Sequence, residues 1–352
     1  MMKLSDLSSH ISDWFSGTGP AGDIVISSRI RLARNLRNFD FLSRCATHKK
    51  KKILEQLREA LQTVTLGEQT FFVRIDEIPQ LHSDLLVERQ LISRQHALGI
   101  GPRGAVIAES EFFTAMINEE DHLRIQVLKA GQQLSECWKL IDRIDDELQQ
   151  KIQYAFDRQY GYLTACPTNV GTGIRVSVML HLPALKMTKH IEKFFNMTRD
   201  MNLALRGLFG EGTETVGDFY QLSNQATLGV SETEIIALFT DTIIPKISEY
   251  ENLARQALLT RGANLLADKM HRALAILSNA RMISSHEALS LLSQVRMGVH
   301  MKQVKTVSIS TINELFMLTQ PAHLQINSGR KLDPAQRDFC RAEIIRTRLS
   351  QN

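Results

Sequence analysis

The chain has 352 residues, of which 43% are hydrophobic and 23% are charged, and its formal net charge is +4. This composition is typical of a globular protein with a buried core, and it excludes a disordered or fibrous chain. The four cysteines show no C-x-x-C spacing, so we expect reduced thiols rather than a zinc knuckle or a disulfide framework. No apolar run reaches the roughly 18 residues of a membrane span, and the start of the chain lacks a signal-peptide pattern, so we expect a cytoplasmic protein.

The predicted elements mix strands and helices over the first two thirds of the chain. Residues 1–22 are polar and end in the Gly-rich GTGPAG, which predicts a flexible lead. Alternation of apolar residues predicts strands at 23–32, 70–76, 104–109, 122–128, 174–182, 203–206 and 218–223. Apolar residues three and four apart predict helices at 48–64, 80–92, 131–152, 183–200 and 231–262.

The last hundred residues show a helical pattern without strand signals. Ala, Leu, Ser and Arg dominate there, with helical spacing through ALAILSNARMISSHEALSLLSQVRMG. The sequence therefore predicts an α+β domain over residues 23–254, followed by an all-α domain over residues 255–352.

Four predicted strands carry arginine on one face and aliphatic residues on the other, because alternate side chains of a strand share a face. One such strand is commonly a half-exposed surface strand. Four of them, without matching acids, predict a sheet face that binds an anion, and a polyphosphate suits several guanidinium groups. These residues are Arg29 and Arg31 in IVISSRIRL, Arg124 in NEEDHLRIQV, Arg175 in TGIRVSVML and Arg206 in NLALRG.

Two acids and a thiol stand out beside the arginines. In NEEDHLRI, alternation places Glu120 and His122 on the face of Arg124, and it leaves the neighbouring acids at the strand entry or on the other face. Glu211 lies between two glycines in RGLFGEGTE, where the backbone can approach a ligand closely. Cys166 begins the turn CPTNVGTG. The usual nucleotide-binding motifs, G-x-x-x-x-G-K-[ST] and G-x-G-x-x-G after a strand, are missing.

These motifs together resemble the phosphagen (guanidino) kinase family, which includes the creatine and arginine kinases. SSRIRLARN, NEEDHLRI, CPTNVGTGIR and RGLFGEGTE are each similar to a family motif, over about residues 23–254. The resemblance implies a largely antiparallel sheet flanked by helices, with ATP and Mg²⁺ as cofactors. The chain is most similar to the bacterial protein-arginine kinases. Only about 22 residues precede the strand that holds SSRIR, where small-molecule kinases carry a helical domain, and those kinases lack the helical C-terminal domain.

The resemblance also implies roles for particular residues. The catalytic residues would be Glu120, Glu211 and Cys166, with Glu120 as the base. Gln90, in LVERQLIS, stands where the family usually has a nucleotide-binding His. Magnesium would be held by phosphate oxygens and water, so no protein ligand is named. The nucleotide-binding residues would be Ser27, Ser28, Arg29, Ile30, Arg31, Gln90, Arg124, Arg175, Val176, Ser177, Val178, Met179, Arg206, Gly207, Leu208, Phe209 and Gly210.

The C-terminal segment RDFCRA holds Arg337, Asp338 and Arg341. An N-cap at Asp333 and a capping box with Gln336 predict that a helix carries it. The spacing alone favours a solvated helix face. The segment resembles an R-D-x-x-R-A motif of the bacterial protein-arginine kinases, which implies a phosphoarginine-binding pocket.

Two other functions stay open: a kinase for free arginine or another small guanidino compound, and a non-catalytic adaptor that binds phosphoarginine. The resemblance implies protein substrates with exposed arginines, which are marked for regulated degradation or include a repressor whose function changes. It further implies a role in stress response and protein quality control, a zinc-binding activator protein, a ClpC-type protease and a homodimer. We expect no nucleic-acid or membrane partner.

Overall fold

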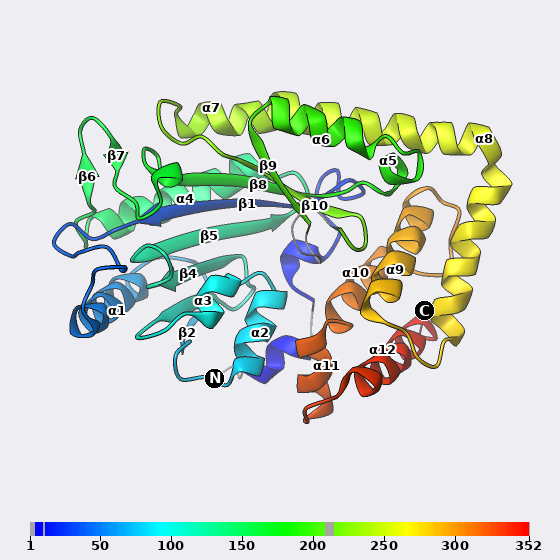
Figure 1. Ribbon diagram of the computed structural model, residues 1–352, viewed down its shortest axis with the longest axis horizontal. Helices are drawn as coiled ribbons and strands as arrows, with labels where there is room; N and C mark the ends of the chain where they lie inside the picture. Colours follow the sequence, from blue (N-terminus) through cyan, green and yellow to red (C-terminus); the bar gives the residue numbers. More distant parts are fainter. Residues whose placement is uncertain (1–3, 10, 208–214, 352) are drawn as a thin grey trace.

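The computed structural model describes residues 4–9, 11–207 and 215–351 (Figure 1). An eight-stranded antiparallel sheet, in the order β2-β3-β4-β5-β1-β8-β10-β9, forms the body of the first part of the chain. This confirms the predicted antiparallel sheet. The strands are β1 (Val25–Arg34), β2 (Thr70–Arg74), β3 (Gly104–Ala108), β4 (Phe113–Ile117), β5 (Leu123–Ala130), β8 (Ile174–His181), β9 (Leu203–Gly207) and β10 (Phe219–Asn224), with a separate hairpin of β6 (Phe156–Asp157) and β7 (Gly161–Tyr162).

Helices cover one face of this sheet and leave the middle of the other face for the site. α4 packs on β1 and β5, and α1 packs on β3 and β4. α2 packs with α3 and contributes to a second hydrophobic cluster at the β2–β3 end of the sheet. The helices of this part are α1 (Thr47–Gln62), α2 (Gln80–Glu88), α3 (Arg94–Leu98), α4 (Leu134–Gln149), α5 (Pro183–Met187), α6 (Ile191–Asp200) and α7 (Glu232–Ala237).

A long helix, α8 (Ile244–Asn279), connects the sheet to the C-terminal helices. It follows a π-helical turn at Leu238–Ile243 and bends at Gly262, whose backbone is not helical. In Figure 1 it runs above the sheet and then turns down one side. The predicted domain boundary after residue 254 falls inside this helix. The remaining helices are α9 (Ser285–His300), α10 (Ile309–Leu318), α11 (Pro321–Ser328) and α12 (Pro334–Leu349).

Tertiary packing changes several predicted elements. The β4 segment FTAMI was missed because it is buried throughout and shows no apolar–polar alternation. The helix predicted at 80–92 ends at Glu88, since Gln90 adopts a left-handed backbone with φ of 61°. The helix predicted at 183–200 is divided into α5 and α6. The predicted capping box of α12 is confirmed.

The predicted flexible lead is packed over its described part. Two short 3₁₀ helices, Leu4–Ser9 and Asp13–Phe15, lie there. Trp14 and Phe15 are buried in the main hydrophobic core, and Phe15 contacts the rings of Phe219 and Phe316. The lead therefore joins the sheet to the C-terminal helices.

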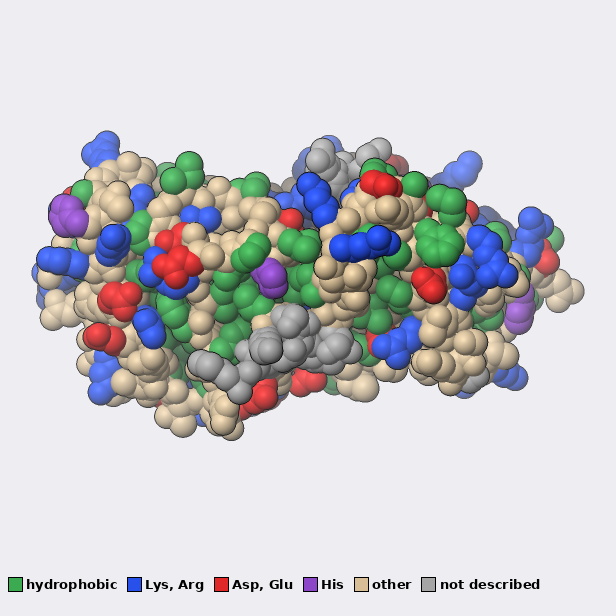
Figure 2. All heavy atoms as spheres, turned by 90° about the horizontal axis from the view of Figure 1, so that it is seen from below, with side chains coloured by type: hydrophobic (Ala, Val, Ile, Leu, Met, Phe, Trp, Pro, Cys, Tyr) green, Lys and Arg blue, Asp and Glu red, His purple; other side chains and the backbone are tan. Residues whose placement is uncertain are grey.

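The surface is mixed in charge on the face seen in Figure 2. Basic and acidic side chains lie there among hydrophobic ones, over both halves of the molecule. None of the described helices is long and apolar enough to span a bilayer.

Candidate active site

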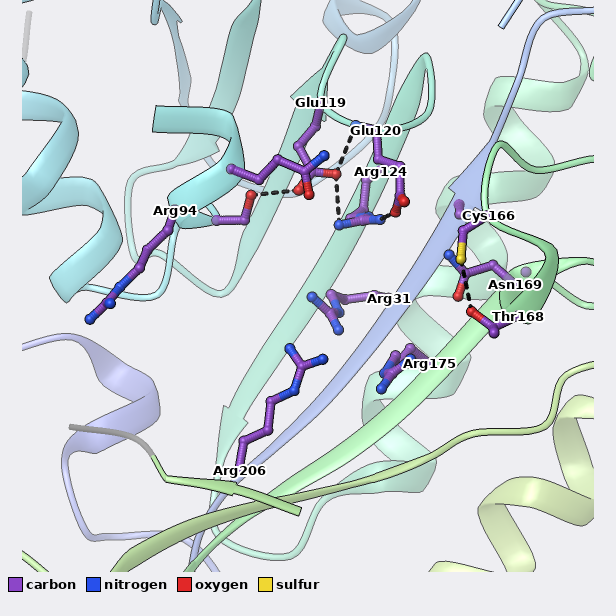
Figure 3. A pocket seen from close by; sticks show the side chains of 14 residues that line it. Arg31, Arg94, Glu119, Glu120, Arg124, Cys166, Thr168, Asn169, Arg175 and Arg206 are labelled. Atoms are coloured by element: carbon purple, nitrogen blue, oxygen red, sulfur yellow. Dashed lines mark hydrogen bonds and ion pairs between the residues drawn. The ribbon is translucent and has the colours of Figure 1, made fainter. Parts of the chain in front are cut away.

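Four arginines from four strands of the sheet point into one cavity of about 510 Å³ (Figure 3). Arg31 of β1 pairs directly with Arg175 of β8 in the sheet register. Arg124 comes from β5, on the other side of β1, and Arg206 from β9. Strand alternation places all four guanidinium groups on the same face, as the sequence predicts.

These arginines lie close enough to disfavour one another's charge. Burial, followed by the charges of neighbouring arginines, lowers the pKa of Arg29 to about 10. Burial is also the main cause that lowers the pKa of Arg31 and Arg175. Within the described residues, Arg31 Nε is buried and has no hydrogen-bond partner. The cluster therefore has unmet capacity to bind an anion.

Two carboxylates close one end of the cavity. Arg124 forms ion pairs with Glu119 at 2.7 Å and with Glu120 at 2.8 Å. Glu119 is only 1% exposed, whereas Glu120 is 32% exposed. The Ser93 hydroxyl and the Glu120 backbone N–H both donate to Glu119. Glu120 is thus the more accessible of the two carboxylates at this end of the cavity.

The sequence missed Glu119 and misplaced His122, because β5 begins only at Leu123. The acids before it lie in a turn, where strand alternation does not apply. His122 is fully buried, accepts from the Leu36 N–H at Nδ1, and donates from Nε2 to the Asp40 carbonyl. The adjacency of the two glutamates in NEEDHLRI is the signal that could have indicated Glu119 as well.

Asp121 links this turn to the opposite wall of the cavity. Its Oδ1 accepts from the Ala165 N–H at 2.7 Å and from the Asn35 amide at 2.6 Å. Burial is the main cause that raises the pKa of Asp121. The hydrogen bond to Ala165 fixes the turn that presents Cys166.

Cys166 lies on that wall together with Thr168 and Asn169 (Figure 3). Its Sγ is 3.0 Å from the Thr168 hydroxyl. The Thr227 hydroxyl donates to the Thr168 and Val170 carbonyls and holds the turn in place. The thiol therefore faces the same cavity as Glu120.

The other predicted binding residues separate into three groups. Arg29 lies at a small cleft, where its Nε donates to the Ser177 hydroxyl at 3.3 Å and its terminal nitrogen approaches Gln90 Oε1 at 3.5 Å. Ser27, Gln90, Ser177 and Met179 line that cleft, and Gly207 ends β9. Ser28, Ile30, Val176 and Val178 are buried at alternate strand positions, on the face opposite the arginines. Glu211, Leu208, Phe209 and Gly210 lie outside the described residues.

The RDFCRA segment forms part of α12, far along the chain from the sheet. Arg341 is buried and donates to the carbonyls of Thr319 and Ile283. It also forms an ion pair with Asp338 at 2.6 Å. Half-buried Arg337 donates to the Leu332 carbonyl at 2.9 Å. Asp338 thus holds a guanidinium of this chain.

An antiparallel sheet that presents clustered arginines beside a half-buried carboxylate and a half-buried thiol defines the class of guanidino phosphotransferases. Residues 52–254 match the family model of the ATP:guanido phosphotransferase C-terminal catalytic domain. Residues 263–352 match that of the protein-arginine kinase McsB C-terminal domain.

Curated relatives extend over nearly the whole chain. A protein-arginine kinase of Halothermothrix orenii is 43% identical over 351 residues, which are 99% of this chain and 100% of that protein. A protein-arginine kinase of Symbiobacterium thermophilum is 45% identical over 96% of this chain and 97% of that protein. The chain therefore belongs to the protein-arginine kinase family of guanidino phosphotransferases.

Solved structures of guanidino kinases share the fold. A lombricine kinase matches with a TM-score of 0.59 and 25% identity, over 72% of this chain and 71% of that one. The duplicated taurocyamine kinase of Schistosoma mansoni, solved with bound transition-state analogue components, also gives a TM-score of 0.59 at 25% identity. That match covers 70% of this chain and 35% of the other.

Proposed function

We propose that this protein transfers the γ-phosphoryl group of ATP to the guanidino group of arginine side chains in proteins. The observation that carries the proposal is the convergence of four arginines, Glu120 and Cys166 on one cavity. The arginines suit a triphosphate, and the acid and thiol suit a guanidinium. The sequence relationship to protein-arginine kinases supports the same activity.

In the proposed reaction, the guanidine nitrogen forms a bond to the γ-phosphorus while the bond from that phosphorus to the β–γ bridging oxygen breaks. Glu120 takes the proton that the nitrogen loses, and ADP leaves. A guanidinium with a pKa above about 12 is a poor nucleophile, so removal of this proton during transfer matters. Arg31, Arg124 and Arg175 bind the phosphate oxygens and stabilise the migrating group, together with Arg29 and Arg206.

ATP enters these kinases with Mg²⁺, and we name no protein ligand for the ion. Among the described residues, no group of three or more His, Cys, Asp or Glu side chains is placed to hold a metal. Arginines dominate the cavity, and Arg124 engages both of its carboxylates. The phosphate oxygens and water are therefore the ligands that we propose for the ion.

We further propose that residues 23–254 act as the catalytic unit and residues 255–352 as a phosphoarginine-binding unit. Arg337, Asp338 and Arg341 would bind the modified side chain. By resemblance to the family, we also propose homodimerisation, a zinc-binding activator, a ClpC-type protease and a role in stress response. We further propose a cytoplasmic location.

The deciding experiment is incubation with ATP, Mg²⁺ and either casein or free arginine. Acid-labile phosphate on the arginines of casein, with none on free arginine, is the result that the proposal requires. Phosphorylation of free arginine alone would instead identify a small-guanidine kinase. Failure to modify either acceptor, with phosphoarginine still bound, would identify an adaptor.

A further inference from the structure

The C-terminal helices contact the sheet domain next to the nucleotide end of the site, where α11 lies beside α2 (Figure 1). The N-cap residue of α11, Gln320, makes no side-chain cap hydrogen bond. The carboxylate of Glu88, at the end of α2, accepts from the backbone N–H groups of Ala322 at 2.7 Å and His323 at 3.1 Å. Glu88 therefore caps a helix that lies far away in the sequence.

The side chain of His323 extends this contact into the interior. Its Nδ1 lies 2.7 Å from Glu88, and its Nε2 lies 3.3 Å from a terminal nitrogen of Arg89. A guanidinium can only donate, so Nε2 accepts and Nδ1 carries the proton that His323 donates to Glu88. Arg89 also binds Glu111 at 2.7 Å, and all three of His323, Arg89 and Glu111 are buried. Glu88, the last residue of α2, and Arg89, which follows it, are thus fixed from the C-terminal side.

The next residue is Gln90, which borders the nucleotide cleft. Its φ of 61° lies in the left-handed region, which non-glycine residues rarely adopt without support from their surroundings. The Gln126 side-chain amide donates to the Gln90 carbonyl at 2.8 Å, and the Gln90 side chain accepts from the guanidinium of Arg29. The Gln90 backbone N–H also donates to the Val87 carbonyl at 3.0 Å, so the place of Gln90 depends on the end of α2 as well as on the sheet.

We propose that Glu88 and His323 are positioning residues for nucleotide binding, and that the α11–α2 contact fixes Gln90 and, through it, Arg29. The proposal rests on the nucleotide role proposed above for Arg29 and Gln90. It makes the C-terminal helices a structural part of the ATP site, although the proposed nucleotide-binding side chains all come from the sheet domain. The acceptor end of the cavity, at Glu120, lies outside this chain of contacts.

The test uses the full chain, with Mg·ADP as the probe and calorimetry as the measurement. Glu88→Gln keeps the side-chain shape but replaces one acceptor oxygen by a donor, so we expect Mg·ADP to bind about fivefold more weakly. The KM for casein should change by less than about twofold. Glu88→Asp keeps the charge and should restore part of the affinity, and it serves as the second variant if Glu88→Gln does not fold.

A double-mutant cycle separates positioning from general destabilisation. If Glu88 acts through Gln90, Glu88→Gln should weaken binding no further in a Gln90→Ala background. Ser293→Ala is the matched control, because it removes a buried hydrogen bond between α9 and His181 at the end of β8. It should lower the unfolding temperature and leave Mg·ADP affinity unchanged.

Additive effects in the cycle, or unchanged Mg·ADP affinity in Glu88→Gln, would overturn the proposal. A loss of Mg·ADP affinity in Ser293→Ala equal to that in Glu88→Gln would also overturn it, because the effect would then report stability alone. Unchanged affinity in both Gln90→Ala and Arg29→Ala would instead remove the nucleotide role on which the proposal rests.

Discussion

Two groups of arginines in this protein have opposite surroundings. On the sheet face, Arg31, Arg175 and Arg206 point into a cavity, and within the described chain none of them forms an ion pair. In α12, Arg341 is buried, and it bonds to the carbonyls of Thr319 and Ile283 and to Asp338. The sheet arginines thus lack ion-pair partners within the described chain, whereas Arg341 already has one.

The difference separates a ligand site from a structural contact. A buried cation without a partner is costly, and a fold retains several together where a ligand supplies the missing charge. A buried cation with all its bonds made within the chain fixes the elements that it joins. For an arginine, the number of guanidinium N–H groups that already have a partner within the chain is therefore a better guide to function than its burial or its motif spacing.

The acid beside the sheet arginines offers the strongest test of this comparison. If Glu120 leaves Arg124 to act on the acceptor, Glu120→Gln should lower kcat by about 10²- to 10⁴-fold, because a general base is lost. Mg·ADP affinity should change by less than about twofold, since the phosphate-binding arginines remain. Phosphoarginine formation on casein and calorimetry measure the two effects. Near-normal formation of phosphoarginine by the variant would contradict the assignment of Glu120 as the base.

The structural arginine should give the next largest effect, on stability. Arg341→Ala leaves the Thr319 and Ile283 carbonyls without a donor in the interior, so we expect the free energy of unfolding to fall by about 2–4 kcal/mol. Urea denaturation measures this change. Mg·ADP affinity, determined at a temperature where the variant is folded, should stay the same. A variant as stable as the parent would contradict the structural reading of Arg341.

Substitution of a sheet arginine should instead weaken nucleotide binding without lowering the free energy of unfolding. Arg175→Ala removes a phosphate contact, and we expect Mg·ADP to bind at least about tenfold more weakly. The free energy of unfolding without nucleotide should be unchanged or higher, because repulsion from Arg206 and Arg124 is relieved. Urea denaturation with and without Mg·ADP checks both results in one series. A loss of stability without nucleotide would show that Arg175 is structural as well.

The sheet arginines could be predicted from the sequence because strand alternation is a strict geometric rule. A strand that carries Arg29 and Arg31 between Ile30 and Leu32 has one face available for the core and one for the arginines. Neighbouring strands bring the faces together without further information. Local pattern and tertiary structure agree at these positions.

The prediction from sequence failed where strand alternation ends and where contacts with distant segments determine the position of a side chain. Glu119 and His122 lie at a turn, so their directions follow from hydrogen bonds to Ser93 and to Leu36, which sequence spacing does not reveal. Trp14 is buried by elements from elsewhere in the chain. The two carbonyls that satisfy Arg341 come from positions 22 and 58 residues away along the chain, and no pattern within RDFCRA indicates them.

Arg337→Ala should give the smallest effect of these substitutions, and it separates phosphoarginine binding from stability in the RDFCRA helix. Its one described side-chain hydrogen bond goes to the Leu332 carbonyl, just before α12, so Arg337→Ala should cost about 1 kcal/mol or less of stability. If the helix binds phosphoarginine, the variant should bind it about threefold to tenfold more weakly by calorimetry. Arg341→Ala cannot report this binding alone, because it also removes the bonds that hold the helix. Arg337→Ala separates the two roles, and unchanged phosphoarginine affinity in a fully folded variant would count against the pocket.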